Sequence, residues 1–421
     1  MSTLEQKSTL TTIPYSCFQH ICLYVGNIRS VFSSIALLSK YSYQQFKNET
    51  FSVAVSDMNR GSLIDSFFDF LSKLRILKSL RLHKVKLTST HLASLEDSDY
   101  CLSKLKVLEL SHVDNEINLW DCCFTGELAL EKLVVSCSNV TYIGSFLAHT
   151  PKLLSLEISH LRDFGNSDIN QLEPVLYKLK HLKLRNLPIT DTALIFIKRQ
   201  IVNYCSSVNG NDLKVPSLMM ERLEISCKNI THLIFDILLE TRQHFPNLVA
   251  LDVSTCAISN CVSLKRLLNA DGLQIRELGI GCNRLDDDVL LQCLANDYDS
   301  MNLESASDNT YIQILSLKQS SISGKSLSRL ASKFMHTLCR LDVSWCNSIH
   351  GRDFEFLSGL KRLEELICNN SRRLDSNDVI NLVLKLPTLR LLSCINCPLV
   401  KLQKLKSKVP ATIWGRIVIR V

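Results

Sequence analysis

Hydrophobic and polar positions follow one short pattern that recurs along most of the chain. Apolar residues are spaced as L-x-x-L-x-L, with one residue, polar in most copies, between the last two. A spacing of two is typical of a short β-strand with one buried face. Twelve copies occur, and the middle apolar residue of each, called here its reference residue, lies at position 80, 108, 133, 156, 182, 223, 251, 278, 315, 341, 366 or 392.

A helix is predicted after several of these strands. The stretches 191–197 and 378–384 have apolar residues at helical spacing, and each begins with an Asp whose carboxylate can cap free backbone amides. One strand–helix unit cannot bury its apolar side alone, but stacked units can. The pattern therefore predicts an α/β leucine-rich-repeat horseshoe solenoid, with a parallel inner sheet and outer helices. The alternative, a helical bundle, is disfavoured by twelve copies that keep strand spacing.

Two longer steps interrupt the period. Most reference residues are 23 to 28 positions apart, but two steps measure 41 and 37. Inserted loops are therefore predicted near Lys198–Pro216 and Ala295–Thr310, which are rich in Asn, Ser and Asp.

Composition favours a well-packed intracellular protein. The 421 residues are 46% hydrophobic, with only 13 Gly and 9 Pro, which argues against a disordered or low-complexity chain. Residues 1–16 contain no apolar signal core, and Ile21–Leu38 is too interrupted by polar residues to span a membrane. We expect no membrane association and a location in the cytoplasm, the nucleus or both. The 17 cysteines are then expected to be packed thiols.

The net charge of +7 is concentrated near the C-terminus. Residues 401–421 hold six Lys or Arg and no acid. Within this predicted basic cap, Lys401, Lys404 and Lys408 recur at helical spacing, and Ile413–Val421 alternates as a closing strand would. Two interpretations stay open, a solvated cap or an electrostatic contact to a phosphate-bearing or acidic partner.

Side chains that flank the buried strand positions are expected to point into the curve of the horseshoe. They include seven Lys or Arg and seven Asp or Glu, a balance that disfavours nucleic acid and suits a protein partner. Ile367, Leu391 and Ile395 make this face apolar at its C-terminal end. The residues predicted to bind the partner are His181, Lys183, Arg185, Arg222, Asp252, Arg340, Asp342 and Trp345.

Candidate chemistry is sparse. Cys394 and Cys397 form a CxxC, but both fall on positions expected to face the core, and no second pair has zinc-finger spacing. The run Asp286–Asp288 falls at a predicted helix start, where negative charge is favourable. Phosphate-loop, dinucleotide-binding, HExxH and GxSxG motifs do not occur. We therefore predict no catalytic, metal-binding or cofactor-binding residues.

Two repeats carry a more specific signature. Leu251-Asp-Val-Ser-Thr-Cys256 and Leu341-Asp-Val-Ser-Trp-Cys346 resemble the cysteine-containing subclass of leucine-rich repeats, best known from F-box proteins. The resemblance spans roughly residues 74–400, although many repeats have Ser or Lys in place of the Cys. It directs attention to residues 1–50, because an F-box is an N-terminal helical module that docks on a Skp-type adaptor of cullin ubiquitin ligases.

The N-terminal pattern is similar to an F-box in its apolar positions. Ile13-Pro14 precedes Phe18 and Ile21 at helical spacing, and the resemblance implies that these four residues meet the adaptor. No acid follows Pro14, and Tyr43 stands where the family often has Trp. The alternative is a plain helical cap on the first repeats.

The predicted organisation is a head at 1–50, a connecting segment at 51–73 with a helix near 63–74, the solenoid at 74–400 and the basic cap at 401–421. The resemblance implies a non-catalytic substrate receptor of an SCF-type (cullin) ubiquitin ligase that binds its target protein on the concave face. The alternative is a non-enzymatic leucine-rich-repeat scaffold without a role in ubiquitin transfer.

Overall fold

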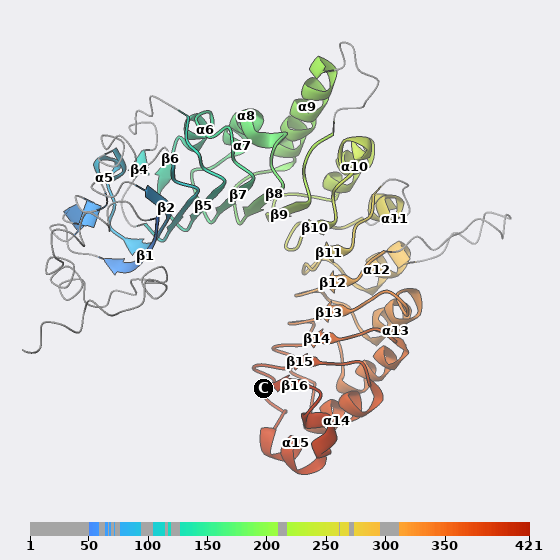
Figure 1. Ribbon diagram of the computed structural model, residues 1–421. Helices are drawn as coiled ribbons and strands as arrows, with labels where there is room; N and C mark the ends of the chain where they lie inside the picture. Colours follow the sequence, from blue (N-terminus) through green and yellow to red (C-terminus); the bar gives the residue numbers. More distant parts are fainter. Residues whose placement is uncertain are drawn as a thin grey trace, which may run out of the picture. The chain divides into compact units, whose positions relative to one another are not determined.

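The structure is a computed structural model that describes residues 50–58, 64–65, 67–68, 71, 76–93, 104–113, 117–118, 127–208, 217–260, 262–268, 273–294 and 311–421 (Figure 1). It comprises two compact units, Met1–Lys183 and Leu184–Val421. The boundary falls inside strand β8 (His181–Arg185). The predicted head, with Ile13, Pro14, Phe18 and Ile21, lies outside the described residues, of which Thr50 is the first.

The first unit alternates strands with short helices. Its main sheet follows the order β1-β2-β3-β5-β7-β8, and β4 and β6 form a separate two-stranded sheet. The described elements are β1 (Thr50–Met58), β2 (Ile76–Val85), α5 (Ser89–Ala93), β3 (Val107–Ser111), β4 (Ile117–Asn118), β5 (Lys132–Ser136), β6 (Val140–Thr141), α6 (Ile143–Leu147), β7 (Ser155–Ser159), α7 (Asn166–Ile169), η3 (Asn170–Leu172) and α8 (Glu173–Leu176).

The second unit repeats the same alternation with shorter strands and longer helices. Its strands run in order from β9 to β16. The described elements are α9 (Asp191–Val208), β9 (Arg222–Ser226), α10 (Leu233–Glu240), η4 (Arg242–His244), β10 (Ala250–Asp252), α11 (Val262–Leu268), β11 (Glu277–Gly279), α12 (Asp287–Leu294), β12 (Ile314–Ser316), α13 (Gly324–Lys333), β13 (Arg340–Asp342), η5 (Gly351–Gly359), β14 (Glu365–Ile367), α14 (Ser376–Lys385), β15 (Leu391–Ser393), α15 (Leu402–Lys408), α16 (Ala411–Trp414) and β16 (Val418–Arg420).

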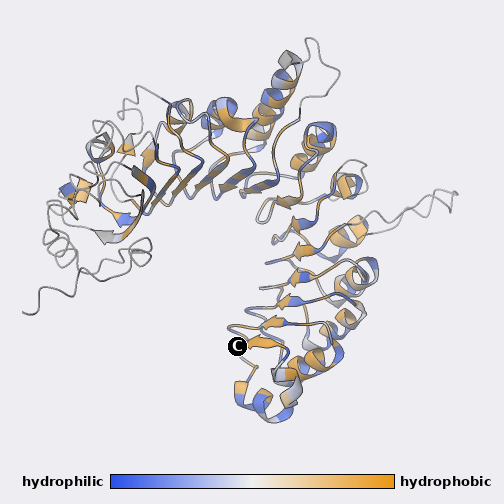
Figure 2. Ribbon diagram, in the orientation of Figure 1, coloured by the Kyte–Doolittle hydropathy of each residue, from blue (hydrophilic) through white to orange (hydrophobic). Residues whose placement is uncertain are grey.

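Within each unit the strands pair in parallel and in the register of the repeat. Reference residues lie side by side, as in Leu108↔Leu133 of the first unit and Leu315↔Leu341 of the second. These leucines are at most 4% exposed. In both units helices line one side of the strands (Figure 1), and hydrophobic and hydrophilic residues alternate along the elements (Figure 2). The prediction of an α/β leucine-rich-repeat solenoid with a parallel sheet is confirmed.

The sheet contains strands that the repeat pattern did not count. β1 falls in the predicted connecting segment and pairs in parallel with β2. At the other end, β16 pairs with β15, while the alternating stretch 413–421 is only partly strand, because Ala411–Trp414 is helical. The solenoid sheet therefore extends beyond residues 74–400 at both ends.

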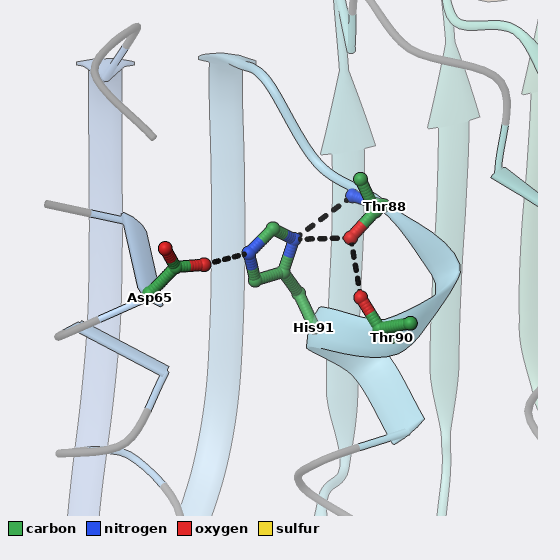
Figure 3. A network of polar contacts seen from close by, with 4 residues as sticks. All are labelled: Asp65, Thr88, Thr90 and His91. Atoms are coloured by element: carbon green, nitrogen blue, oxygen red, sulfur yellow. Dashed lines mark hydrogen bonds and ion pairs between the residues drawn. The ribbon is translucent and has the colours of Figure 1, made fainter. Parts of the chain in front are cut away.

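Residues of the same predicted connecting segment also anchor a helix start (Figure 3). His91 Nε2 lies 2.8 Å from Asp65 Oδ1, and His91 Nδ1 accepts the Thr88 amide hydrogen at 3.0 Å. Thr88 Oγ1 lies 2.7 Å from both His91 Nδ1 and Thr90 Oγ1. Because Nδ1 accepts the amide, His91 carries its proton on Nε2 and donates it to Asp65. His91 thus caps the Thr88 amide at the start of α5, as the second residue of a capping box does, and Asp65 holds the imidazole ring in place.

The first predicted insertion is largely helical, which corrects the loop prediction for its N-terminal part. Helix α9 continues through Lys198 to Val208. Its buried residues Ile197, Ile201 and Cys205 are four apart, so one apolar face persists beneath the polar Asn and Ser residues. Residues 209–216 and the second predicted insertion, 295–310, lie outside the described part of the chain.

Acids at helix starts act partly as predicted. Asp378 Oδ2 accepts the amide of Asp375 at 2.9 Å, which completes a capping box at α14. The Asp286–Asp288 run does lie at the start of α12, and Asp286 Oδ1 accepts the Val289 amide at 3.0 Å. Asp191 differs from the prediction, because both its oxygens accept hydrogen bonds from Thr231 in the following repeat, each at 2.8 Å. Asp191 thus joins neighbouring repeats.

Among the described residues, no helix combines the length and the apolar character that crossing a membrane requires.

Candidate protein-interaction face

The repeat gives every strand one buried and one outward row of side chains. In β3, Leu108 and Leu110 are buried, whereas Val107, Glu109 and Ser111 are half-buried. Counting the reference residue as position 0, positions −1, +1 and +3 thus line what we call the exposed sheet face. In each unit this face carries most of the Lys, Arg, Asp and Glu residues that the sequence predicts for it.

At position +4 the backbone turns away from the strand. In ten repeats the residue there has a positive φ; they are Lys84, His112, Cys137, His160, Asn186, Thr255, Gln319, Trp345, Asn370 and Asn396. In seven of them the amide donates to the +3 carbonyl of the next repeat, as in Trp345 N to Asn369 O at 3.0 Å. Hydrogen bonding between repeats therefore continues beyond the assigned strands.

Ion pairs between strands dominate the face of the first unit. Glu109 accepts Arg81 Nε at 3.1 Å and Lys132 Nζ at 2.7 Å, so one carboxylate neutralises cations from both neighbouring strands. Glu157 accepts Lys183 Nζ at 2.9 Å. These pairs lie on equivalent positions of adjacent repeats, where side chains from neighbouring strands can meet.

Three more ion pairs lie on the face of the second unit, and one of them, Arg222–Glu277, reaches past the intervening strand β10. Arg185 Nε pairs with Glu224 Oε1, Arg222 Nη2 with Glu277 Oε1, and Arg340 Nη1 with Glu365 Oε2 at 3.3 Å. Of the seven predicted face cations, only Lys318 has no acidic partner among the described residues. The face therefore offers little free positive charge for a phosphate backbone.

Two predicted residues, Asp252 and Asp342, keep unneutralised charge. One oxygen of each accepts a nearby amide, from Ser254 and from Ser344, both at 2.9 Å. Neither carboxylate has a cationic partner in the described part of the chain. The strand neighbours of Asp342 are Ser316 and Ile367, which carry no charge.

Trp345 follows directly after this strand. Its side chain is 43% exposed and its φ is 65°. A bulky aromatic residue in the left-handed region is uncommon, since most residue types avoid it. The structure thus places an unneutralised carboxylate and an exposed indole three residues apart on one repeat.

The predicted cluster of His181, Lys183 and Arg185 is real as a row on β8 but is not a free positive patch. Lys183 and Arg185 are each engaged with a glutamate, while His181 is exposed. The sequence prediction treats each repeat separately, so it does not include ion pairs between strands of different repeats. Aligning position +1 of one repeat with positions −1 and +1 of the next identifies three of the six pairs, those of Glu109 and Glu157.

Cysteines at position +5 have a structural role. Cys256 Sγ donates to Ile225 O at 2.9 Å, Cys346 Sγ to Leu317 O at 3.1 Å and Cys397 Sγ to Cys368 O at 3.2 Å. Each acceptor belongs to the preceding repeat. Burial raises the pKa of Cys256 and of Cys346 to about 12. These thiols therefore stay protonated and link neighbouring repeats.

The CxxC faces the core, as predicted. Cys394 is 0% and Cys397 5% exposed. Burial raises the pKa of Cys394 to about 12 and also raises that of Cys397, which disfavours the thiolates that metal binding and redox exchange need. Among the described residues, no group of three or more His, Cys, Asp or Glu side chains is placed to hold a metal ion.

No family model and no curated protein matches the chain. Among solved structures, it is similar to the internalin InlF from Listeria monocytogenes strain 4b F2365, at 19% identity and a TM-score of 0.39, over 75% of this chain and 71% of that chain. It is also similar to the crystal structure of the Rad7 and Elc1 complex in yeast, at 14% identity and a TM-score of 0.45, over 93% and 96%. Neither similarity decides the function.

Proposed function

We propose that this chain is the substrate-recognition subunit of an SCF-type (cullin) ubiquitin ligase and performs no chemistry itself. In this proposal the head binds a Skp-type adaptor through Ile13, Pro14, Phe18 and Ile21, and the exposed sheet face binds a target protein. A repeat solenoid suits the second task, because its stacked strands hold many side chains in fixed register over an extended surface.

The observation that best supports a binding role is which charged side chains of the face are paired with one another and which are not. Six of its seven predicted cations are paired with acids, whereas Asp252 and Asp342 are not. Such a surface repels a nucleic-acid backbone and favours a protein that supplies complementary polar groups. Trp345, exposed beside Asp342, is the residue type most often found at energetic centres of protein interfaces.

The predicted partner-binding residues then divide into two groups. Asp252, Asp342 and Trp345 are available to the target. Lys183, Arg185, Arg222 and Arg340 pair with acids of other strands and contribute mainly by fixing the shape of the face. His181 joins the row on β8.

The second candidate is a leucine-rich-repeat scaffold without a role in ubiquitin transfer. The exposed sheet face, the feature that supports partner binding, serves either function equally well. The two candidates differ only in what the head does.

Adaptor capture by the full chain separates them. Tagged protein is purified from cells and probed for Skp-type adaptor and cullin subunits. Pro14→Ala/Phe18→Ala should lose the adaptor while the melting temperature stays unchanged, since an F-box has a core of its own. The matched control Ser16→Ala/Gln19→Ala changes polar residues of the same stretch and should retain it. A wild-type chain that captures no adaptor, or a double mutant with lowered melting temperature, supports the scaffold and a capping head.

A further inference from the structure

Charge and exposed leucines coincide at the C-terminal end of the second unit. Residues 350–421 contain thirteen Lys or Arg and six Asp or Glu, so their net charge equals the +7 of the whole chain. We define the basic end surface as Arg372, Arg373, Lys401, Lys404 and Lys408 together with Leu399 and Leu402.

These residues come from adjoining segments. Asp375, just after Arg372 and Arg373, forms a parallel bridge with Leu399. The Lys401 amide donates to Ser376 Oγ at 2.7 Å, and Ser376 Oγ donates to Leu399 O at 3.3 Å. Two turns of chain are thus held side by side, and α15 with its lysines follows directly.

The acids nearby are occupied by the helix start. Asp375 Oδ1 accepts the amides of Asn377 and Asp378 at 2.6 and 2.9 Å, and Asp378 Oδ2 accepts the Asp375 amide. These backbone hydrogen bonds hold the pKa of Asp375 below its usual value, with a smaller contribution from the charge of Lys404. The acids are half-buried, whereas Arg372, Lys401 and Lys408 are exposed and have no ion-pair partner among the described residues.

Apolar side chains beside these cations narrow the choice of ligand. Leu399 is 52% and Leu402 42% exposed. Leucines cannot stack on bases as aromatic rings do, so the surface is poorly suited to single-stranded nucleic acid. Helix α15 has only seven residues, too few for the broad apolar face with which amphipathic helices enter a bilayer. Exposed cations and exposed leucines on adjoining segments complement a protein segment that carries the opposite charge and apolar side chains.

We propose that the basic end surface binds a protein segment in which Asp or Glu residues are interspersed with apolar side chains. The acids pair with Arg372, Lys401 and Lys408, and the apolar groups cover Leu399 and Leu402. The contact is independent of the adaptor and of the exposed sheet face.

Direct binding to defined probes tests this. The full chain is titrated against a labelled helical peptide with Leu at helical spacing among Glu residues, and against the same peptide with every Glu changed to Gln. The Glu peptide should bind at least about tenfold more tightly, and added salt should reduce the difference, because exposed charges are screened within about 10 Å at 0.1 M salt. Equal binding of the two peptides, or none by either, overturns the proposal.

Charge reversal locates the contact. Arg372→Glu/Lys401→Glu/Lys408→Glu should weaken Glu-peptide binding by about tenfold or more. The matched control Lys228→Glu/Arg266→Glu/Lys361→Glu reverses three exposed cations elsewhere in the second unit and should bind as wild type does. Leu399→Ser/Leu402→Ser, which keeps every charge, should also weaken binding. A reversal variant that binds the peptide as wild type does contradicts the assignment.

Two further probes address other anionic ligands. Vesicles of phosphatidylserine and phosphatidylcholine and a DNA duplex are tested on the same variants. Tighter binding of either than of the Glu peptide, lost in the reversal variant, would identify a lipid or nucleic-acid surface instead. If the reversal variant melts early, the Gln substitutions at the same three positions replace it in every assay.

Discussion

The exposed sheet faces of the two units are built from the same repeat but neutralise their charges differently. In the first unit, Glu109 and Glu157 each hold at least one cation from a neighbouring strand. In the second unit, Asp252 and Asp342 occupy the same position +1, yet each turns an oxygen to an amide two residues ahead in its own chain. The difference is one methylene group in the side chain.

This difference has a simple geometric cause. Neighbouring strands are about 4.8 Å apart, and a glutamate can span that distance to meet a cation. The three described glutamates at position +1, Glu109, Glu157 and Glu224, all do so. An aspartate is too short and satisfies a local amide instead, as Asp commonly does in turns. The choice between Glu and Asp at position +1 therefore decides whether a repeat neutralises itself or leaves a charge for a partner.

The largest effect on stability is expected from a change in the buried core of either unit. Leu156→Asp in the first unit or Leu341→Asp in the second places a charge where the leucine is 0% exposed. Each should lower the free energy of unfolding by more than about 4 kcal/mol. Thermal unfolding followed by circular dichroism measures this, and the control is Ser155→Asp, which introduces the same charge one residue from Leu156, at a half-buried position opposite Lys132. A core mutant that melts like wild type would show that the register is wrong.

How far the damage spreads sharpens the comparison. Because each repeat is stabilised by its neighbours, destabilisation should extend along the array. Limited proteolysis of the two mutants shows whether Leu341→Asp exposes cleavage sites in the second unit before the first. Simultaneous loss of both units from either mutation would mean that they unfold as a single cooperative structure.

These core positions were predictable from sequence, whereas much of the face was not. Alternation fixes which leucines are buried, because a shift of one residue would expose them all. The role of Asp191 in joining repeats and the extension of α9 through Lys198–Val208 were missed, since both depend on contacts with the following repeat. β1 was missed because its sequence, Thr50–Met58, lacks the leucines of the pattern. The adaptor-binding residues of the head stay a prediction.

The buried thiols of the second unit should give a smaller, pH-dependent effect. Cys346→Ala removes the Sγ to Leu317 O hydrogen bond and should cost about 1–2 kcal/mol at pH 7. Burial raises the pKa of this thiol from 9.0 to about 12 in the folded state. The folded protein therefore keeps a proton that the unfolded chain loses. Its contribution is complete below pH 9 and is lost as the pH rises toward 12, by about 1.4 kcal/mol per pH unit.

Urea unfolding between pH 8 and pH 10 measures that slope. The difference between wild type and Cys346→Ala should shrink as the pH rises, because the mutant lacks the titrating group. Val343→Ala, which removes buried apolar atoms from the same repeat but no titrating group, is the control and should leave the slope unchanged. Parallel slopes for wild type and Cys346→Ala would rule out the buried-thiol explanation.

Removing one carboxylate from the exposed sheet face should lower the free energy of unfolding by less than Cys346→Ala does. Glu109→Gln disrupts the pairs with Arg81 and Lys132 and should lower the free energy of unfolding by about 0.5–1 kcal/mol, since the cations are exposed to solvent. Asp342→Asn should change stability by less than about 0.5 kcal/mol, because the amide oxygen can still accept from Ser344 and no ion pair is lost. Unfolding in 0.05 and 1 M salt distinguishes them, as only the Glu109 effect should diminish. An equal loss of stability in Glu109→Gln and Asp342→Asn would contradict the difference in charge pairing between the two faces.

The last prediction concerns Trp345, where the effect of the backbone conformation can be separated from that of the exposed side chain. Replacement by Ala or by Asn removes the same indole, but Asn tolerates the φ of 65° better than Ala does. Asn already occupies this position in the next two repeats, at Asn370 and Asn396. Trp345→Asn should therefore be more stable than Trp345→Ala by about 0.5–1 kcal/mol. At Phe356, an exposed aromatic residue inside η5, the order should reverse, because Ala has the higher helix propensity.

Both Trp345 variants should lose the target protein equally. If Asn restored target binding that Ala abolished, the indole would matter only through the backbone conformation that it adopts.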